Sequence, residues 1–180
     1  MDENETRMNQ LREKRAKAQL LRDWDRLRAL HGENFVAVIT EATGRVLSLG
    51  DFDSKSEPWP IEWPADIRDA TGLVAAHVSR SDCIKLWACG REKLSSLCGK
   101  IGFHEKPYLG FAALQGADPV TLLEVAEKTQ DSVVFYNDSP SGIVMVDCYE
   151  SQPTEPFSVV VQGDELVQLL TPCFNRRQPD

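Results

Sequence analysis

The sequence predicts an α+β protein with a mixed or mainly antiparallel sheet, helices packed on that sheet, and an N-terminal amphipathic helix that precedes it. Its 180 residues and hydrophobic content of 42% suit one domain with a terminal extension. Hairpin patterns alternate with single strand–helix units along the chain. This order favours an antiparallel or mixed sheet over a doubly wound parallel sheet.

Two parts are expected, a basic amphipathic helix over residues 1–33 and an acidic α+β domain over residues 34–180. No proline or glycine occurs between Thr6 and Leu30. One stripe of this segment repeats at spacings of four, three and four, as Leu20, Trp24, Leu27 and His31. Gly32 follows as a typical helix end. Because the stripe fades before Leu20, the first turns of the helix are expected to project.

The acidic domain is expected to open with a hairpin. Residues 35–40 are apolar and β-branched, and alternation resumes over residues 45–49. Prolines then predict a loop over residues 51–64, since each removes a backbone donor and favours extended geometry before it. Apolar residues at helical spacing predict a helix over residues 65–79.

Shorter helices and strands are expected in the middle of the domain. A strand is expected over residues 84–89, ended by Gly90, and a helix over residues 91–100. Residues 108–114 form an apolar run of the kind buried on both faces of a sheet. Asp118-Pro119 predicts a helix start, because aspartate caps a helix and proline fits its first turn.

The C-terminal third contains the clearest hairpin, with strands at residues 133–136 and 143–149 around a polar turn. A strand over residues 157–162 follows. Gly163-Asp164 is expected to start a short helix, which Thr171-Pro172 should stop because proline cannot continue its hydrogen bonding.

Charge is divided unevenly between the two parts. The net charge is −8, but residues 1–34 hold eight Lys/Arg and seven Asp/Glu, while residues 35–180 hold 12 against 21, a net charge of −9. Residues 12–28 hold seven basic and three acidic residues, a net charge of +4. An acidic domain disfavours nucleic acid, because phosphate binding depends on cations. A basic protein partner is expected instead.

The composition also predicts a cytoplasmic setting. No apolar run approaches the roughly 18–20 residues that span a bilayer, and the first five residues are acidic where a signal peptide is basic. No membrane association is therefore expected. The five cysteines include no Cys-x-x-Cys pair, so free thiols in a reducing compartment are expected rather than disulfides.

The search for catalytic motifs leaves one cluster of reactive residues. The sequence contains no phosphate-binding glycine loop, no serine-hydrolase elbow and no zinc-protease motif. The cluster consists of His77, Cys83, Cys89, Cys98 and His104. Five to eight residues separate successive members, too many for one strand or helix to converge them on a zinc ion. Neither a metal nor another cofactor is expected.

One alternative is a cysteine-dependent enzyme. Cys89 lies where the expected strand ends and the expected helix begins, and a helix N-terminus lowers the pKa of a thiol. Either His77 or His104 would then serve as the base. Buried, unreactive cysteines that pack as small apolar groups are the competing interpretation.

Two segments indicate a binding role. Trp59 and Trp63 lie on a stiff, proline-rich loop, where large aromatics lose little entropy on binding; the competing interpretation is that they cover the core of their own domain. The N-terminal helix carries Arg15 and Arg22 beside the apolar Trp24, and its stripe would pack on the domain or mediate self-association. The competing interpretation of its basic residues is that they stay solvated or lie against the acidic domain of the same chain.

These observations together favour binding over catalysis. The expected function is a small cytoplasmic protein-binding regulator, of adaptor or immunity-protein type, whose acidic surface engages a basic protein partner. A small-ligand sensor is a further alternative, since a sheet flanked by helices can enclose a pocket.

Overall fold

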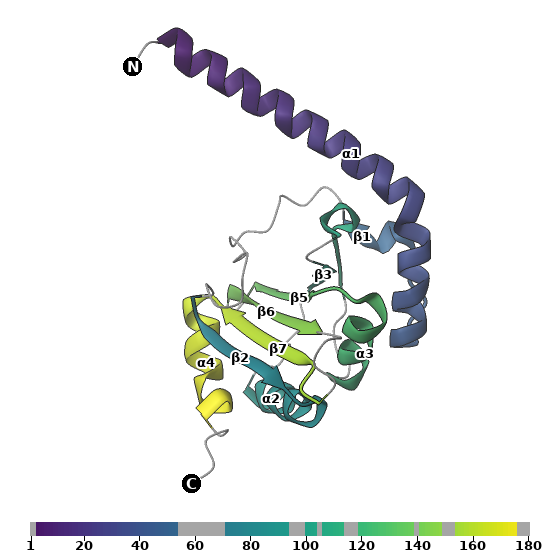
Figure 1. The fold of residues 1–180 in the computed structure, drawn as a ribbon, viewed down its shortest axis with the longest axis vertical. Coiled ribbons are helices and arrows are strands. Elements are labelled where there is room, and N and C mark those ends of the chain that lie inside the picture. Colours follow the sequence, from purple (N-terminus) through teal and green to yellow (C-terminus); the bar gives the residue numbers. More distant parts are fainter. Residues whose placement is uncertain are drawn as a thin grey trace.

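The structure is a computed structural model and describes residues 3–53, 71–93, 100–103, 106–113, 119–138, 141–148 and 154–175. Within these residues it has the predicted α+β fold. A long helix, α1 (Glu3–Thr43), precedes a seven-stranded sheet that carries the other helices (Figure 1).

The sheet has the strand order β1-β4-β3-β5-β6-β7-β2, and each pair in it is antiparallel. Its strands are β1 (Phe52–Asp53), β2 (Leu73–Val78), β3 (Lys100–Phe103), β4 (Phe111–Ala112), β5 (Val133–Asp138), β6 (Ser141–Cys148) and β7 (Phe157–Gln162). The remaining elements are η1 (Leu49–Asp51), α2 (Arg80–Lys93), η3 (Pro107–Leu109), α3 (Pro119–Thr129) and α4 (Asp164–Asn175).

The predicted C-terminal hairpin and the strand after it are confirmed as β5, β6 and β7, the centre of the sheet. Val134 pairs with Met145, which in turn pairs with Val160, and all three side chains are buried. Successive residues of a strand point to opposite faces, so β-branched runs such as Val159–Val161 supply apolar side chains to both faces.

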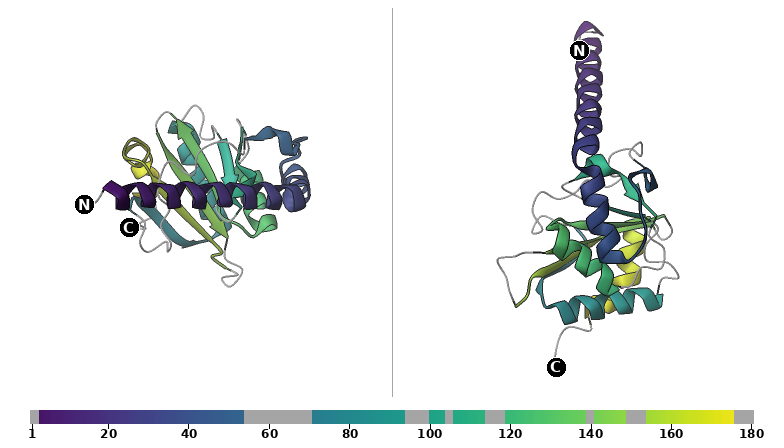
Figure 2. Two further views of the ribbon diagram at one scale, coloured as in Figure 1. Left: turned by 90° about the horizontal axis from the view of Figure 1, so that it is seen from above. Right: turned by 90° about the vertical axis from the view of Figure 1, so that its right-hand side faces the viewer.

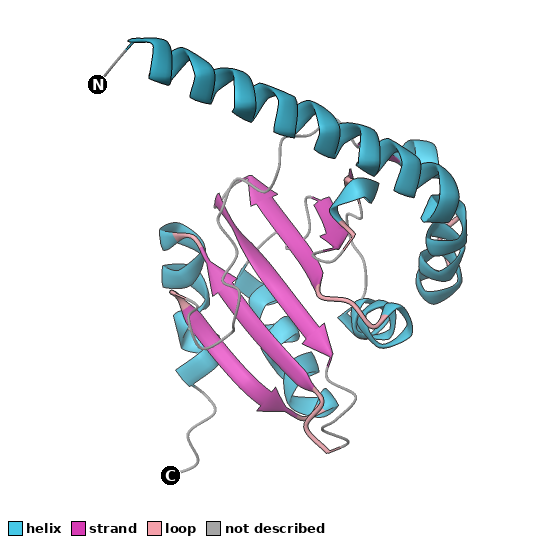
Figure 3. Ribbon diagram, turned by 45° about the horizontal axis from the view of Figure 1, so that its top comes forward, coloured by secondary structure: helices cyan, strands magenta, loops and turns pink. Residues whose placement is uncertain are grey.

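Helices cover one face of this sheet, and Figures 2 and 3 show the two layers. The main core joins Val144, Val146 and Val159 from the strands to residues of all four α-helices. Trp87 of α2 packs edge-on against Phe135 of β5, with ring centroids 4.7 Å apart. The helices α2, α3 and α4 therefore hold their positions through burial against β5, β6 and β7.

The strand predicted over residues 35–40 is wrong, because α1 continues to Thr43. Val36, Ile39 and Ala42 are buried at spacings of three, which is the period of a helix face packed on a core. Burial against α3 therefore outweighs the β-propensity of this run. The helix ends at Gly44, whose positive φ of 65° suits a C-terminal cap.

Gly32, expected to end the helix, lies inside α1 and is buried. A Cβ atom there would lie 2.7 Å from Leu49 Cδ1, so the glycine allows close approach of the helix to η1. Of the predicted strand over residues 45–49, only Leu49 lies in regular structure, as the first residue of the short 3-10 helix η1, so the predicted first hairpin is wrong.

The predicted order of helix and strand around residue 80 is reversed. Residues 73–78, expected to be helical, form the edge strand β2 against β7. Residues 84–89, expected to be a strand, lie inside helix α2, which continues through Gly90. Cys83, Leu86 and Trp87 are buried at helical spacing. Of the helix predicted over 91–100, residues 94–99 lie outside the described residues.

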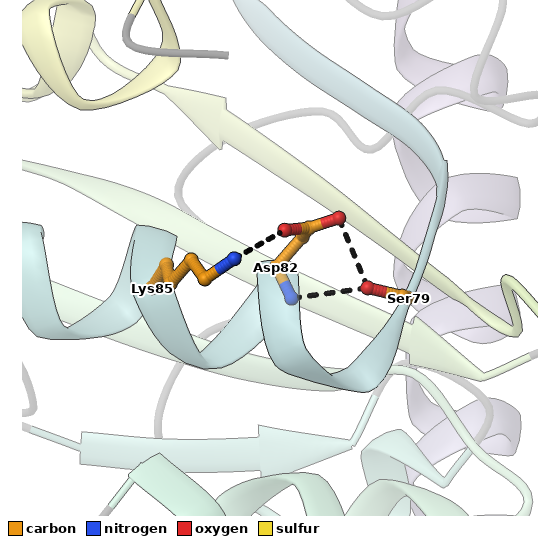
Figure 4. Close-up of polar contacts among 3 residues, drawn as sticks. All are labelled: Ser79, Asp82 and Lys85. Atoms are coloured by element: carbon orange, nitrogen blue, oxygen red, sulfur yellow. Dashed lines mark hydrogen bonds and ion pairs between the residues drawn. The ribbon is translucent and has the colours of Figure 1, made fainter.

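Helix α2 begins with a polar cap that the sequence contains as Ser79-Arg80-Ser81-Asp82 (Figure 4). Asp82 N donates to Ser79 Oγ at 3.2 Å, and Ser79 Oγ donates to Asp82 Oδ2 at 2.9 Å. Lys85 Nζ donates to the other carboxylate oxygen at 3.1 Å. The bond from Asp82 N satisfies a backbone donor that has no partner within the helix, and the start of α2 at Arg80 follows from this cap.

Helix α4 passes through Pro172, where it was expected to stop, and ends at Asn175. Leu170 and Cys173, on either side of the proline, are both buried. Their packing therefore offsets the hydrogen bond that Pro172 cannot donate.

Candidate functional site

The first half of α1 is a bare helix, which we call the arm (residues 5–23). Every residue of the arm is exposed, and Figures 1 and 2 show it extending beyond the sheet. At 1.5 Å per residue the arm is about 28 Å long. Of the predicted binding residues, Arg15 and Arg22 lie on the arm and are exposed, while Trp24 follows it and is half-buried.

The arm and the turns after it hold most of the exposed apolar side chains. Among the described residues, eight large hydrophobic residues are exposed, and six of them belong to α1: Met8, Leu11, Leu20, Leu21, Leu27 and Leu30. Leu30 is 59% exposed and Leu20 is 48% exposed. The exposed large apolar side chains of the described residues are therefore concentrated on α1.

Arg28 attaches the root of the arm to the rest of the domain. Its guanidinium donates to the carbonyl of Leu49 at 2.6 Å, to that of Phe52 at 2.7 Å, and to that of Leu109. These acceptors lie in η1, β1 and η3, so one side chain ties three segments to α1. We call Arg28 and its three carbonyl acceptors the clasp.

The charge of Arg28 is retained in this setting. Burial lowers the pKa of Arg28 from its ordinary value, while the nearby carboxylates of Asp25 and Asp53 oppose that change. An arginine keeps its proton throughout the physiological pH range. The clasp therefore consists of charge-assisted hydrogen bonds, which are stronger than neutral ones.

A second polar contact lies where the packed half of α1 meets the sheet. Lys106 Nζ donates to Asp131 Oδ2 at 2.9 Å and lies 4.8 Å from the centre of the Phe35 ring. Phe35 packs edge-on against Phe103, with ring centroids 4.8 Å apart. The Asp131 side chain is fully buried, and removing a carboxylate from water costs free energy. Its ion pair with Lys106 offsets part of that cost.

The cysteine cluster does not have the predicted geometry. Cys89 forms a disulfide with Cys173, 84 residues further along, and this bond joins α2 to α4. The expectation of free thiols is therefore wrong for this pair. Cys89 also lies inside α2 rather than at a helix N-terminus, so the reason for expecting a lowered thiol pKa is removed.

A pocket lies beside this disulfide, between α2, α4 and the strands β6 and β7. It has room for about one water molecule, a volume of about 10 Å³, and its lining is Cys83, Leu86, Trp87, Gly90, Val144, Val159, Val161, Leu170, Cys173 and Phe174. Trp87 Nε1 is buried and has no hydrogen-bond partner. A pocket this small with an almost wholly apolar lining lacks the several convergent polar groups that orient a typical ligand.

Of the two histidines predicted as candidate bases, only His77 lies within the described residues. His77 is exposed on β2 and has a positive φ of 54°, within a register shift between Ala75 and Val78. This bulge turns Ala75 and Val78 inward and His77 outward. His104 lies outside the described residues, as do Cys98 and the predicted binding residues Trp59 and Trp63.

The described residues contain neither a metal-binding cluster nor a helix suited to span a membrane. None of their His, Cys, Asp and Glu side chains gather in a group of three or more suited to a metal ion. In the same residues, no helix has the combined length and hydropathy for crossing a bilayer.

The fold and its surfaces define an α+β protein with a projecting helix. Comparison with known proteins adds no family: no protein-family model, curated protein or solved structure matches this chain.

Sequence reasoning missed the two cations that connect α1 to the sheet. In the sequence Arg28 is one of several basic residues of the predicted N-terminal helix, and no motif distinguishes Lys106. The partners of Arg28 are backbone carbonyls 21, 24 and 81 residues away, which no local pattern indicates. The sequence position of Asp131 gives a weak signal, since it lies between the predicted helix that begins at Asp118-Pro119 and the apolar strand that begins at Val133.

Proposed function

We propose that this chain is a protein-binding regulator, of adaptor or immunity-protein type, whose acidic domain engages a basic protein partner. The observation that carries the proposal is the net charge of −9 on residues 35–180. A net charge of one sign on a compact domain raises the rate at which oppositely charged partners associate with it.

The pairing of the domain's cations supports this assignment. Four of them are already engaged with carboxylates of the same chain: Arg80 with Glu124 and Glu127, Lys85 with Asp82, Lys106 with Asp131, and Lys128 with Glu41. The acidic residues outnumber the basic ones by nine, so carboxylates remain after such pairing. Glu92 and Glu155 are two that are exposed.

The test begins with capture of proteins by the immobilised full chain at physiological salt. Retained proteins are identified, and the most abundant basic one is purified for surface plasmon resonance at several salt concentrations. The variant Glu92→Lys/Glu155→Lys brings the net charge of the domain from −9 to about −5, and its control is Glu92→Asp/Glu155→Asp.

The expected result is an association rate several-fold lower for the lysine variant, with a weaker salt dependence, and an unchanged rate for the control. The proposal fails if the retained proteins are not basic, or if the purified binder associates equally fast with both variants at low salt.

A cytoplasmic setting is part of the same proposal, and the Cys89–Cys173 pair provides its test. Disulfides persist mainly in oxidising compartments, so a cytoplasmic chain should hold this pair reduced. Intact cells are treated with an alkylating agent before lysis, and the two cysteines are examined by mass spectrometry. Alkylation of both supports the cytoplasm, whereas a fully oxidised pair in untreated growing cells excludes it.

A further inference from the structure

We infer that the arm docks on the acidic domain of a second copy of this chain. This goes beyond the proposed function, because it concerns self-association rather than a foreign partner. The arm supplies basic and apolar side chains, and the domain of the second copy supplies the carboxylates.

The first support is the lack of packing around the arm. All 19 of its residues are exposed, so no described element of its own chain buries a face of this helix. Most of the stability of helices in proteins comes from tertiary packing, which the described residues do not supply to the arm. Four exposed apolar residues lie on the arm itself: Met8, Leu11, Leu20 and Leu21. A helix with this surface gains stability when a partner covers it.

The second support is charge complementarity. The arm holds six basic and three acidic residues, a net charge of +3, and residues 35–180 carry −9. Arg12, Lys14, Arg15 and Lys17 are exposed on the part of the arm that projects from its own domain (Figure 1). Their charges are therefore presented to a neighbouring molecule, and a second copy presents an acidic domain to them.

The geometry allows the contact to be reciprocal. The arm is about 28 Å long, while a domain of about 147 residues has a radius of gyration of about 15 Å. The arm therefore spans most of a neighbouring domain. With two-fold symmetry each arm lies on the other domain, so the same contact forms twice and the assembly closes as a dimer.

The clasp gives this arrangement a fixed direction. Arg28 holds the root of the arm to η1, β1 and η3 through three hydrogen bonds. An arm that leaves its domain at a defined point loses less orientational freedom on docking than one on a flexible linker.

The experiment measures the mass of the full-length protein in solution by sedimentation equilibrium, over a range of concentrations at 50 and 500 mM salt. The charge variant is Arg12→Glu/Arg15→Glu, with Lys93→Glu as a control on the domain. The apolar variant is Leu20→Lys, with Val46→Lys as its control, because Val46 is 96% exposed outside the arm. Circular dichroism checks that each variant keeps its helix content.

The expected result is a dimer at 50 mM salt whose dissociation constant rises at least tenfold at 500 mM salt. The two arm variants should weaken the dimer by at least tenfold, and the two controls should not. A protein that is monomeric throughout overturns the inference. So does a dimer that resists salt and charge reversal but is lost in Leu20→Lys, because that result assigns an arm-to-arm coiled coil. Capture of a basic partner is measured separately, so either proposal can fail alone.

Discussion

Replacement of Arg28 by methionine tests whether the clasp holds α1 to the domain. Methionine keeps much of the aliphatic stem but donates no hydrogen bond, so the carbonyls of Leu49, Phe52 and Leu109 lose a charged partner. A hydrogen bond to a charged group contributes about 1.5–3 kcal/mol when it is buried. Arg28 is half-buried, and water can replace part of each bond.

We therefore expect the free energy of unfolding to fall by about 2–4 kcal/mol in Arg28→Met, less than the sum of three fully buried bonds. For a chain of this size that corresponds to a drop in Tm of roughly 5–10 °C. Urea unfolding followed by tryptophan fluorescence measures the change. Arg26→Met is the matched control, because Arg26 is exposed on the same helix and should change stability by less than about 0.5 kcal/mol.

Arg28→Lys separates charge from geometry. A lysine keeps the positive charge but cannot reach three acceptors with the planar fork of a guanidinium, so it should recover only part of the loss. The reasoning is refuted if Arg28→Met is as stable as Arg26→Met, or if lysine restores full stability.

Three further predictions concern other parts of the fold. Reduction of the Cys89–Cys173 disulfide, or the variant Cys89→Ala/Cys173→Ala, should lower the free energy of unfolding by about 3–4 kcal/mol because the bond closes a long loop. Unfolding with and without dithiothreitol measures this, with Cys148→Ser as control, and equal midpoints for wild type in both conditions would contradict it. Ser79→Ala should lower the free energy of unfolding by about 1 kcal/mol, because it removes the cap of α2, whereas Ser81→Ala should leave it nearly unchanged. Thermal unfolding measures both variants, and a larger effect at Ser81 would show that the cap is misassigned. Hydrogen bonds from the backbone and hydroxyl of Ser48 lower the pKa of Asp51 from 3.8, so its stabilising contribution is present at neutral pH and is lost as the pH falls through the lower folded value. Asp51→Asn should therefore be less stable than wild type at pH 7 and equal to it near pH 2, and a stability difference that stays constant down to pH 2 would count against this assignment.

The elements that the sequence predicted correctly are those in which local pattern and burial agree. The hairpin of β5 and β6 combines β-branched runs with a polar turn, and its strands are also the centre of the sheet. The start of α3 at Pro119 follows from the proline's fixed geometry. In these segments local preference and tertiary packing favour the same structure.

The errors arose where burial overrode local preference. Val36 and Ile39 favour strands on their own, but α3 provides a surface that a helix face fits. At the start of α2 the information was present, since Ser79 and Asp82 have the spacing of a capping box. Greater weight on that pattern than on the apolar run after it would have predicted the helix.

The candidate site was less accessible to sequence reasoning than the fold. The exposed, basic arm followed from its weak apolar stripe and its composition. The clasp and the disulfide depend on partners that are distant in sequence, and Cys89 could have paired with any of four other cysteines. Such contacts are set by the packing of whole elements.

The bond between Cys89 and Cys173 also changes how the molecule would respond to mechanical force. When the oxidised chain is pulled from its two ends, the segment between the two cysteines cannot extend, because the disulfide closes it into a covalent ring. This segment spans 84 residues, so the fully extended chain is shorter by about 300 Å. The strands β3 to β7 lie within this ring. In optical-tweezer traces the difference between oxidised and reduced molecules would appear directly as that missing extension.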